Sequence, residues 1–474
     1  MKSCSARERL KGFEVRVLLT VHQFLPQYSS GTEVLTFETA KELRRLGHEV
    51  LVFAGSPASK SIKDEGRFDS YEYQGLHVER FHHDYDHLGG QKNATEAEYN
   101  NLFFAAYFRK FLTKVRPDIV HFFHLSRLSA SAVEVCHSLN IPMVLTATDF
   151  WFVCPTVQLR LPDNSMCQGP RWGGANCVRH IAQLNGSDEA KAIVSKMPDW
   201  LLALAMKAIG LGMFNNNWYA PHVKSLSHRH TFTGTQINRI DRVLVPTRLM
   251  ESILKRNGLE DKRVCYAPFG LNLEYLHFTP RNNTCGPLRL GFIGTLYEHK
   301  GVHVLVQAIT SLGKNVEVQL TIYGNESEYP DYVARLKQLA GSDERVSFCG
   351  TFSNYEIGRI FSSMDALVVP SIWYENTPLV IYSAQAAGCP VIVSDLEGMT
   401  EVIHHEDNGL VFQPGNAAAL AQTLLRLYKD RALLEGMSRR ARKPRSTQEY
   451  AGQIDAVYQE ILAGRAKKEA VCTS

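Results

Sequence analysis

Two long stretches of this chain alternate short apolar runs with segments whose apolar residues recur at helical spacing, and this rhythm restricts the fold more than any other feature. The first run is VRVLLTV at residues 15–21. The segment after the next loop has apolar residues along one helix face, namely Val34, Phe37, Leu43 and Leu46. A continuous apolar run is typical of a strand covered on both faces. Strands that alternate with helices build parallel sheets, so the sequence predicts an α/β fold.

The rhythm occurs twice, which predicts two doubly wound domains. Further strands of the first unit are expected at residues 49–55, 118–123, 142–148 and 242–247, and those of the second at 288–294, 318–324, 346–350, 366–371 and 390–395. The polar stretch TPRNNTCGP is the predicted linker. We therefore expect a first domain at residues 1–278 with an insertion at about 150–240, a second domain at 279–445, and a helical tail at 446–474. Two such domains hold a ligand between them, at the carboxyl ends of the strands.

The totals exclude some classes of protein. The chain has 474 residues and an excess of 4 basic over acidic residues, which is too small to indicate a nucleic-acid partner. No apolar segment follows the charged N-terminus, so we expect no signal peptide and a cytoplasmic protein whose ten cysteines are mostly reduced. The apolar stretch at 200–214 contains Lys207 and is shorter than the roughly 20 residues of a membrane span. We expect it to be a buried helix, with docking on a membrane surface as the alternative.

The loop after the first strand, at residues 22–33, argues against two common nucleotide sites. It lacks the G-x-G-x-x-G pattern of a dinucleotide site, and the chain has no G-x-x-x-x-G-K-[ST] sequence of a P-loop. Gly31 lies just before a predicted helix, so its backbone has room to approach an anionic ligand. The alternative is that Gly31 only serves the turn.

The segment at residues 370–395 carries the first group of candidate site residues. A predicted strand ends near residue 371, the following loop contains Glu375, and a helix is expected to open with Thr377 as its N-cap and Pro378 as its first residue. The amides of the next residues, from Leu379 on, would then face a ligand beside the positive end of the helix dipole, which suits a phosphate. The alternative is that water and the Thr377 cap satisfy these amides.

A second strand, turn and helix at residues 291–309 place Lys300 just before a helix. A lysine in such a loop can neutralise a phosphate, although a solvated surface lysine is the alternative. Two phosphate-competent turns in one domain, together with an acid at Glu375 that can accept sugar hydroxyls, favour a sugar-phosphate ligand.

These segments resemble the GT-B glycosyltransferases, specifically the retaining family 4 (group 1), over nearly the whole chain. The family's motif joins a first acid, here Glu375, to the tail AQAAGCPVI at residues 384–392, and Lys300 in HKG matches its phosphate-binding lysine. GMTEVI and GLVFQPGN resemble its closing pattern. In the first half, SSGTEVLTFETAKELRRLGHEV resembles the donor loop and its helix, and RPDIVHFFH resembles the strand that bears an active-site histidine, here His124.

The resemblance implies a GT-B architecture: two Rossmann-like, doubly wound parallel-sheet domains that face each other across a cleft, with the tail crossing back onto the first domain. It implies that Glu375 holds hydroxyls of the donor sugar and that His124 lies near that sugar. Lys300 and the backbone around three residues, Asn376, Thr377 and Leu379, would hold the diphosphate, which Gly31 would approach from the other domain. No metal ion and no cofactor are expected.

Three residues depart from the family's pattern. Ser383 replaces the second acid of the motif, Thr295 stands where many members have an arginine, and Thr148 stands where many have a histidine, although the neighbouring Asp149 is retained. A neutral contact is weaker than a charge-assisted one. Three readings therefore stay open: an active transferase, a catalytically weakened GT-B scaffold that binds ligand or partners without turnover, and a sugar-nucleotide epimerase of the same architecture.

As an active enzyme, the chain is expected to transfer a sugar from a nucleoside-diphosphate sugar to a hydroxyl of a carbohydrate or lipid-linked acceptor, in polysaccharide or glycoconjugate biosynthesis. Retention would follow from front-face attack by the acceptor, with the leaving phosphate oxygen helping to take its proton. The protein would be cytoplasmic, with peripheral contact at the inner face of a membrane as an option. The donor base, the sugar, the acceptor, the linkage and the oligomeric state stay open.

Two further groups of side chains have the chemistry of a site. Cys154, Cys167, Cys177 and His180 have zinc-ligand side chains, but the gaps between the cysteines are not those of a common structural site, so isolated cysteines are favoured over zinc. His121 is three residues from His124, on the opposite face of a strand, and is expected to be a packed strand residue.

Overall fold

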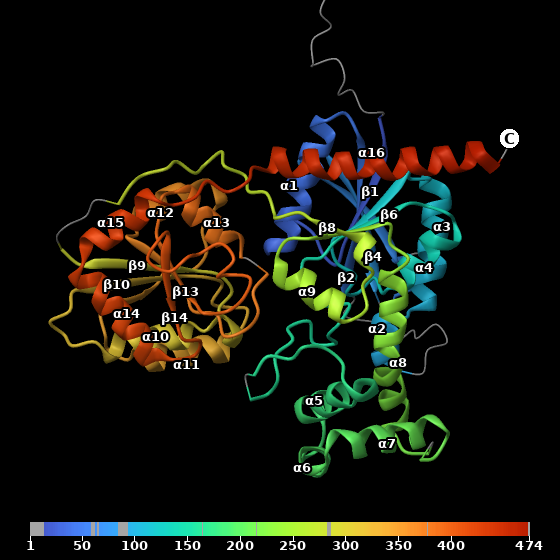
Figure 1. Ribbon diagram of the computed structural model, residues 1–474, viewed down its shortest axis with the longest axis horizontal. Coiled ribbons are helices and arrows are strands. Elements are labelled where there is room, and N and C mark those ends of the chain that lie inside the picture. Colours follow the sequence, from blue (N-terminus) through green and yellow to red (C-terminus); the bar gives the residue numbers. More distant parts are fainter. Residues whose placement is uncertain are drawn as a thin grey trace, which may run out of the picture.

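The computed structural model describes residues 14–57, 62–63, 66–83, 93–163, 165–214, 216–281, 286–376 and 378–472. It consists of two α/β units side by side (Figure 1). We call residues 14–266 with the last helix the N-domain and residues 286–439 the C-domain. None of the helices within these ranges is both long and apolar enough to cross a membrane.

The N-domain is built on an eight-stranded sheet of order β3-β4-β2-β1-β5-β6-β7-β8, in which only the β3–β4 pair is antiparallel. The strands are β1 (Arg16–Val21), β2 (Glu49–Pro57), β3 (Phe68–Tyr73), β4 (Leu76–His83), β5 (Ile119–Phe122), β6 (Met143–Thr146), β7 (Arg242–Val245) and β8 (Val264–Tyr266). The sequence reading missed the β3–β4 hairpin. Its turn is Gln74–Gly75, and both residues have a positive φ, as the tight turn of a two-residue hairpin requires.

The C-domain is built on a six-stranded parallel sheet of order β11-β10-β9-β12-β13-β14. Its strands are β9 (Leu288–Ile293), β10 (Val318–Tyr323), β11 (Val346–Phe348), β12 (Ala366–Val369), β13 (Val391–Ser394) and β14 (Gly409–Phe412). The predicted fold class, two doubly wound parallel-sheet domains, is confirmed. In each sheet the strand order reverses at one place, between β1 and β5 and between β9 and β12, and ligands of such sheets bind at the carboxyl ends of those strands.

Helices cover both faces of each sheet. Those of the N-domain include α1 (Gly31–Arg45), α2 (Ala94–Tyr99), α3 (Leu102–Val115), α4 (Ser131–Ser138) and α9 (Arg248–Arg256). Those of the C-domain include α10 (Val302–Ser311), α11 (Pro330–Ala340), α12 (Ile357–Ser362), α13 (Leu379–Ala386), α14 (Ala417–Lys429) and α15 (Arg431–Arg439). One apolar cluster fills each face of each sheet, because the central strands have apolar side chains on both sides.

The last helix, α16 (Thr447–Cys472), lies across the N-domain (Figure 1). Its Tyr450, Ile454 and Tyr458 belong to the apolar cluster of β1 and α1. The hydroxyl of Tyr458 lies 2.6 Å from Nδ1 of His121, whose Nε2 lies 2.9 Å from the hydroxyl of Thr146. His121 is thus a fully buried strand residue, as predicted, and it ties this helix to the sheet.

The chain crosses between the domains twice, and the two crossings are bonded to each other. The amide of Leu271 donates to the carbonyl of Arg445 at 2.9 Å, and the amide of Thr447 donates to the carbonyl of Leu271 at 3.1 Å. Gly270 fits there because a Cβ at this position would lie 2.6 Å from the carbonyl oxygen of Ser446. The two segments therefore run as one paired connection.

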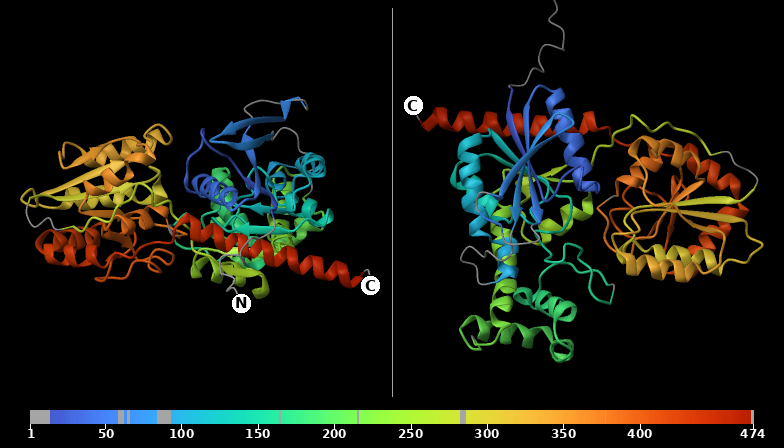
Figure 2. Two further views of the ribbon diagram at one scale, coloured as in Figure 1. Left: turned by 90° about the horizontal axis from the view of Figure 1, so that it is seen from above. Right: turned by 180° about the vertical axis from the view of Figure 1, so that it is seen from behind.

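The segment between β6 and β7 forms a helical arm. It contains α5 (Ala175–Asn185), α6 (Asp188–Lys196), α7 (Asp199–Gly210) and α8 (Ala220–Ile237). α8 leads away from the sheet, and the other three helices lie at its far end (Figures 1 and 2). The expectation of a buried helix at residues 200–214 is wrong, because one face of α7 is buried and the other is exposed.

Candidate functional site

The C-domain half of the candidate site lies where strands β9 and β12 end, at the reversal of strand order. Lys300 ends a short 3₁₀ turn after β9, and Glu375 lies in the loop after β12. The two loops touch: the amide of Ile372 donates to the carbonyl of His299 at 2.9 Å. Gly301 is needed here, since its φ is +70° and a Cβ would overlap the carbonyl oxygen of Pro370.

Glu375 and Lys300 form a buried ion pair. The Nζ of Lys300 lies 2.6 Å from Oε1 of Glu375. The same oxygen accepts hydrogen bonds from the hydroxyl of Ser371 at 2.7 Å and from the indole of Trp373 at 2.9 Å. The Trp373 ring also lies under the ammonium group, 5.3 Å from Nζ to the ring centre. Three donors on one oxygen fix the carboxylate, and with it the position of the lysine.

The charges of this pair are set by their neighbours. Burial raises the pKa of Glu375, but Lys300, Ser371 and His299 outweigh it, so the pKa lies below its usual value. Burial, with Lys300 close by, lowers the pKa of His299 to about 3. Near neutral pH Glu375 is therefore a carboxylate and His299 a neutral imidazole.

The other predicted site residues near Glu375 make contacts of different kinds. Asn376 bridges the domains: its Nδ2 donates to the carbonyl of Ala147 at 3.0 Å, and its Oδ1 accepts from the hydroxyl of Thr247 at 2.9 Å. Thr377 lies outside the described residues. Leu379 is the first residue of α13, whose N-cap is Pro378, so this helix begins one residue later than predicted.

Ser383 and Thr295 lie apart from the ion pair's hydrogen bonds. Ser383 is buried, and its hydroxyl donates to the carbonyl of Leu379 at 3.1 Å, one turn earlier in its own helix. Thr295 follows β9 and is half-buried, and its carbonyl accepts the amide of Tyr297 at 3.0 Å. The Ser383 hydroxyl is thus satisfied within α13, where a longer acid would extend from the helix.

The N-domain half of the site lies at the carboxyl end of β5. His124 is buried, and its Nε2 forms an ion pair with Oδ2 of Asp149. The amide of Ser126 donates to Nδ1 at 2.9 Å, so Nε2 carries the proton that faces the carboxylate. Burial lowers the pKa of His124, but Asp149 outweighs it, and the pKa lies above its usual value.

The segment after β6 holds Asp149 in place. The other oxygen of Asp149 accepts the amide of Trp151 at 2.9 Å, and the hydroxyl of Thr148 donates to the carbonyl of Phe123 at 2.9 Å. His124, Thr148 and Asp149 line one small cavity together with Phe123 and Trp151. Thr148 thus positions the loop by bonding to the end of β5.

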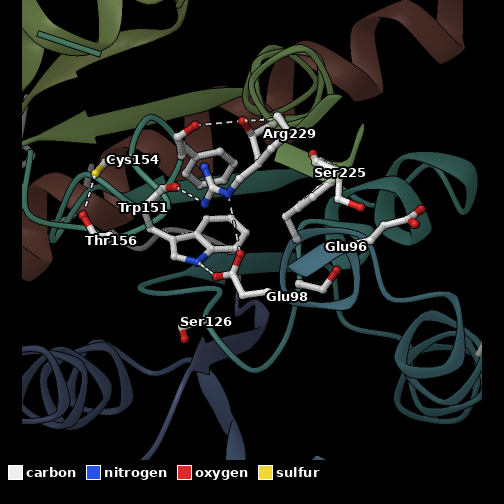
Figure 3. A network of polar contacts seen from close by, with 12 residues as sticks. Glu96, Glu98, Ser126, Trp151, Cys154, Thr156, Ser225 and Arg229 are labelled. Atoms are coloured by element: carbon white, nitrogen blue, oxygen red, sulfur yellow. Dashed lines mark hydrogen bonds and ion pairs between the residues drawn. The ribbon is translucent and has the colours of Figure 1, made fainter. Parts of the chain in front are cut away.

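The helical arm supports this segment (Figure 3). Arg229 of α8 donates to the carbonyl of Trp151 at 2.6 Å, and its guanidinium lies 5.2 Å from the centre of the indole ring. Glu98 accepts a hydrogen bond from the Trp151 indole and forms an ion pair with Arg229 at 3.6 Å. A movement of α8 would therefore reach the Asp149 loop directly.

Two residues of the site escaped the sequence reading, His22 and Glu33. They flank the loop in which only Gly31 was singled out. The ring centre of His22 lies 4.3 Å from that of His124, and its Nε2 lies 3.4 Å from Oε1 of Glu33. Glu33 is fully buried in the first turn of α1, and within the described residues its carboxylate accepts no hydrogen bond of normal geometry. An acid in the first turn of a helix is usually solvated, so the position of Glu33 in the sequence does not indicate that it is buried in a site.

Burial sets the charge states of both residues. It lowers the pKa of His22 well below its usual value, with His124 and Arg127 adding to the effect, and it raises the pKa of Glu33. Gly31 opens α1 beside them, and a Cβ there would meet no atom within 4 Å. Its N-cap, Ser30, makes no side-chain hydrogen bond to the helix, so no Ser30 hydroxyl competes with a ligand for the first amides of α1.

Contacts across the domain boundary bring the two halves together. The carboxylate of Glu401, in the C-domain, accepts the amides of Arg248 and Leu249 at 2.7 and 2.8 Å, at the start of α9 in the N-domain. From the arm, Gln158 lies 3.3 Å from Nδ1 of His299. These contacts and those of Asn376 join the segments after β6 and β7 of the N-domain to the loops after β9, β12 and β13 of the C-domain.

The cysteines of the segment after β6 lie around a different cavity from the one that His124 and Asp149 line. Cys154, Cys167, Cys177 and His180 line a second small cavity between the loop after β6 and α5. The sulfur of Cys167 accepts the amide of Gly169 at 3.4 Å and Nδ2 of Asn176 at 3.6 Å. Over the ranges that the structure describes, no three His, Cys, Asp or Glu side chains are arranged to hold a metal ion. Cys154, Cys167 and Cys177 form no disulfide.

Comparison with known families gives one match in each domain. Residues 287–430 match the family described as glycosyl transferases group 1, and residues 29–182 match the one described as glycosyltransferase family 4. The first range contains Lys300 and Glu375, and the second contains Glu33, His124 and Asp149.

Two curated proteins illustrate the sequence relationship. The amylovoran biosynthesis glycosyltransferase AmsK of Erwinia amylovora is 30% identical over 200 residues, which are 40% of this chain and 48% of that protein. The D-inositol 3-phosphate glycosyltransferase of Arthrobacter sp. strain FB24 is 32% identical over 186 residues, 37% of this chain and 44% of that protein. The chain thus spans less than half the length of these relatives.

Solved structures share the whole architecture. Sucrose-phosphate synthase from Thermosynechococcus elongatus superposes with a TM-score of 0.64 at 17% identity, covering 94% of this chain and 99% of that one. Anabaena HepE in complex with UDP-glucose gives a TM-score of 0.58 at 15% identity, covering 96% of this chain and 100% of that one. At these identities the likeness shows the GT-B fold.

Proposed function

Because this chain belongs to the group 1 glycosyltransferases of family 4, we propose that it transfers a sugar from a nucleoside-diphosphate sugar to a hydroxyl acceptor. The observation that carries the proposal is the fixed Lys300–Glu375 pair at the end of β9 and β12, seated opposite His124 and Asp149. Charge of both signs at one strand reversal suits a ligand that has phosphate at one end and hydroxyls at the other.

In this proposal Glu375 accepts hydroxyl groups of the donor sugar. Its carboxylate is ionised and oriented by Ser371 and Trp373, so it meets the sugar in one position. Lys300, released in part from Glu375, neutralises the diphosphate with the uncapped amides at the starts of α13 and α1. These donors take the role that a metal ion has in other transferases, so transfer is expected without added metal.

The N-domain then faces the anomeric carbon. His124, with its proton held towards Asp149, lies on the side from which the sugar hydroxyls and the acceptor approach. We place the acceptor hydroxyl on the front face of the sugar, where the leaving phosphate oxygen takes its proton, and the anomeric configuration is retained. An inverted product would exclude this course.

The class of donor and acceptor follows from the relatives as a proposal. HepE is solved with UDP-glucose and a starch synthase with ADP, so UDP- and ADP-sugars are the first donors to test. The relative named for amylovoran biosynthesis favours a carbohydrate acceptor in polysaccharide or glycoconjugate synthesis. A lipid-linked acceptor at the cytoplasmic face of a membrane is the second acceptor class to test.

The test has two stages. A thermal-shift screen without metal, against UDP, GDP, ADP and their sugars, should show one base raising the melting temperature. With that donor, transfer or slow hydrolysis should be lost in Glu375→Ala and kept in Glu317→Gln, whose exposed glutamate lies elsewhere in the C-domain. Donor binding without turnover, whichever acceptor is supplied, would favour the weakened scaffold. The observation behind this alternative is that the Ser383 hydroxyl bonds within α13. Equal activity of both variants would contradict the role of Glu375.

A further inference from the structure

The tip of the helical arm exposes a group of large apolar side chains. Trp200, Leu204 and Leu211 are 54%, 53% and 88% exposed. Further exposed members on the same tip are Ile193, Leu201, Met213, Phe214 and Trp218. Elsewhere among the described residues such side chains are scattered singly, as ordinary surfaces have them.

The exposed group follows from a helix with two apolar faces. Leu202 and Met206 of α7 are buried against Val178 of α5 and Leu226 of α8. On the other side Trp200, Leu204 and Leu211 recur at spacings of four and seven residues, which places them on one face. The outer face of a helix in a soluble domain is normally polar. This face, which we call the tip face, is apolar apart from Lys207.

The tip face is well placed to meet a flat surface. α6 and α7 form the end of the arm farthest from the sheets, in the front view and in the view from behind (Figures 1 and 2). α8 has 18 residues, and its contact with the Asp149 loop lies at Arg229, about 14 Å along the helix from Ala220. Neither domain body therefore stands between the tip face and a partner.

The charges near the tip face are mixed on α6 and basic on α7 beyond Asp199: Asp188 lies 3.8 Å from Lys191, and Glu189 is exposed. No Asp or Glu occurs from residue 200 to residue 240. Lys207 is exposed on α7 next to Leu204, and Lys196 is exposed at the end of α6. The acid nearest to Trp200, Asp199, forms an ion pair with Arg179.

We propose that the tip face docks on an anionic phospholipid bilayer. Tryptophan and lysine beside leucines are the side chains that settle at a membrane interface, with rings and ammonium groups at the headgroups and leucines below them. Because residues 200–240 contain no carboxylate, this part of the arm does not repel lipid phosphates, and Lys196 and Lys207 add attraction that salt screens. This contact goes beyond the proposed transfer reaction and does not depend on it.

The docking is tested with the full chain and vesicles, without donor or acceptor. In flotation, vesicles of phosphatidylcholine with phosphatidylglycerol should carry the protein, and vesicles of phosphatidylcholine alone should carry much less. The double variant Leu204→Glu/Leu211→Glu should lower the bound fraction about tenfold, because charged side chains enter the lipid at a high cost. Both leucines are exposed, so the fold should persist, and an unchanged melting temperature checks this.

Leu102→Glu is the matched control. Leu102 lies on α3 and is 53% exposed, the same as Leu204, but far from the tip. Its substitution should leave flotation unchanged. A wild-type blue shift of tryptophan fluorescence on adding the anionic vesicles, lost in Trp200→Ser, would place the lipid at α7.

Three results would overturn the proposal: the double variant floats like the wild type, binding ignores lipid charge at low salt, or no binding occurs. A dimer that the double variant converts to monomer, without flotation, would assign the tip face to a second copy of this chain. Failure of donor binding would leave these outcomes unaffected, so the two proposals fail separately.

Discussion

The ammonium group of Lys300 lies 2.6 Å from Oε1 of Glu375, and this pair joins the two loops that leave the middle of the C-domain sheet. Neither residue is near the other in sequence. Their meeting follows from parallel strand order, because β9 and β12 are neighbours and end at the same edge. The pair thus ties the stability of this edge to the group that would meet a donor.

Replacing Lys300 alone should destabilise the protein more than replacing both Lys300 and Glu375. In Lys300→Met the buried carboxylate of Glu375 loses its counter-ion, and the free energy of unfolding should fall by about 2 kcal/mol, below the ~3–5 kcal/mol of a fully buried pair because Lys300 is partly exposed. Adding Glu375→Gln should restore most of the loss. Urea unfolding of the three proteins measures both values, and a double variant as unstable as the single one would contradict the coupling.

The buried His121 should make the protein acid-sensitive. Burial lowers its pKa from 6.5 to about 3 in the folded protein, whereas the unfolded chain takes up the proton near the ordinary value. Its contribution to stability is therefore present above pH 6.5 and lost as the pH falls towards 3. Between pH 6.5 and 4 the loss is at most about 3 kcal/mol. His121→Gln should flatten this part of the curve of unfolding free energy against pH, and an unchanged slope would speak against it.

Glu33 should show the opposite pH dependence. Folding raises its pKa above 4.5, so its contribution is favourable at low pH and is lost as the pH rises through the folded value. Glu33→Gln should stabilise the protein by about 1 kcal/mol at pH 7.5 and very little at pH 4. Transfer activity should fall at the same time, if the carboxylate serves the site. Glu38→Gln on the same helix, whose acid contacts Lys41 and Asn272, is the control and should show no such gain.

Asn376 should hold the domains together. Asn376→Ala removes the hydrogen bonds to Ala147 and Thr247, each worth about 1 kcal/mol. We expect a larger radius of gyration by small-angle scattering and a modest loss of stability. Asn325→Ala, in a loop of the C-domain, should change neither. An identical scattering curve for both variants would show that other contacts set the domain spacing.

The sequence allowed the sheets to be predicted where apolar runs are continuous, as in β12 (ALVV), since a strand covered on both faces is apolar throughout. It did not allow the β3–β4 hairpin to be predicted, because β3 (FDSYEY) is a polar edge strand. Lys300 and Glu375 were found because each follows a buried strand. His22 and Glu33 were not, because a buried acid in a first helical turn has the same pattern as a solvated one.

Helix α7 of the arm shows a second reason why part of the structure could not be predicted from the sequence. The spacing of apolar residues in α7 gives two stripes, and either could face the protein. Which stripe is covered depends on the path of α5 and α8, which local pattern does not encode. The burial of Leu202 and the exposure of Leu204 are therefore facts of tertiary structure.

The paired crossings at Leu271 and Ser446 set the way in which the two domains can move. Because the two crossing segments are hydrogen-bonded to each other, we expect them to act as a hinge. The C-domain could rotate about the line between them, whereas sliding or twisting would break their bonds. A cut in either strand would leave the domains joined through the other. Opening for substrate entry would then be a rotation about a fixed edge, and closing would return Asn376 to the same two partners each time.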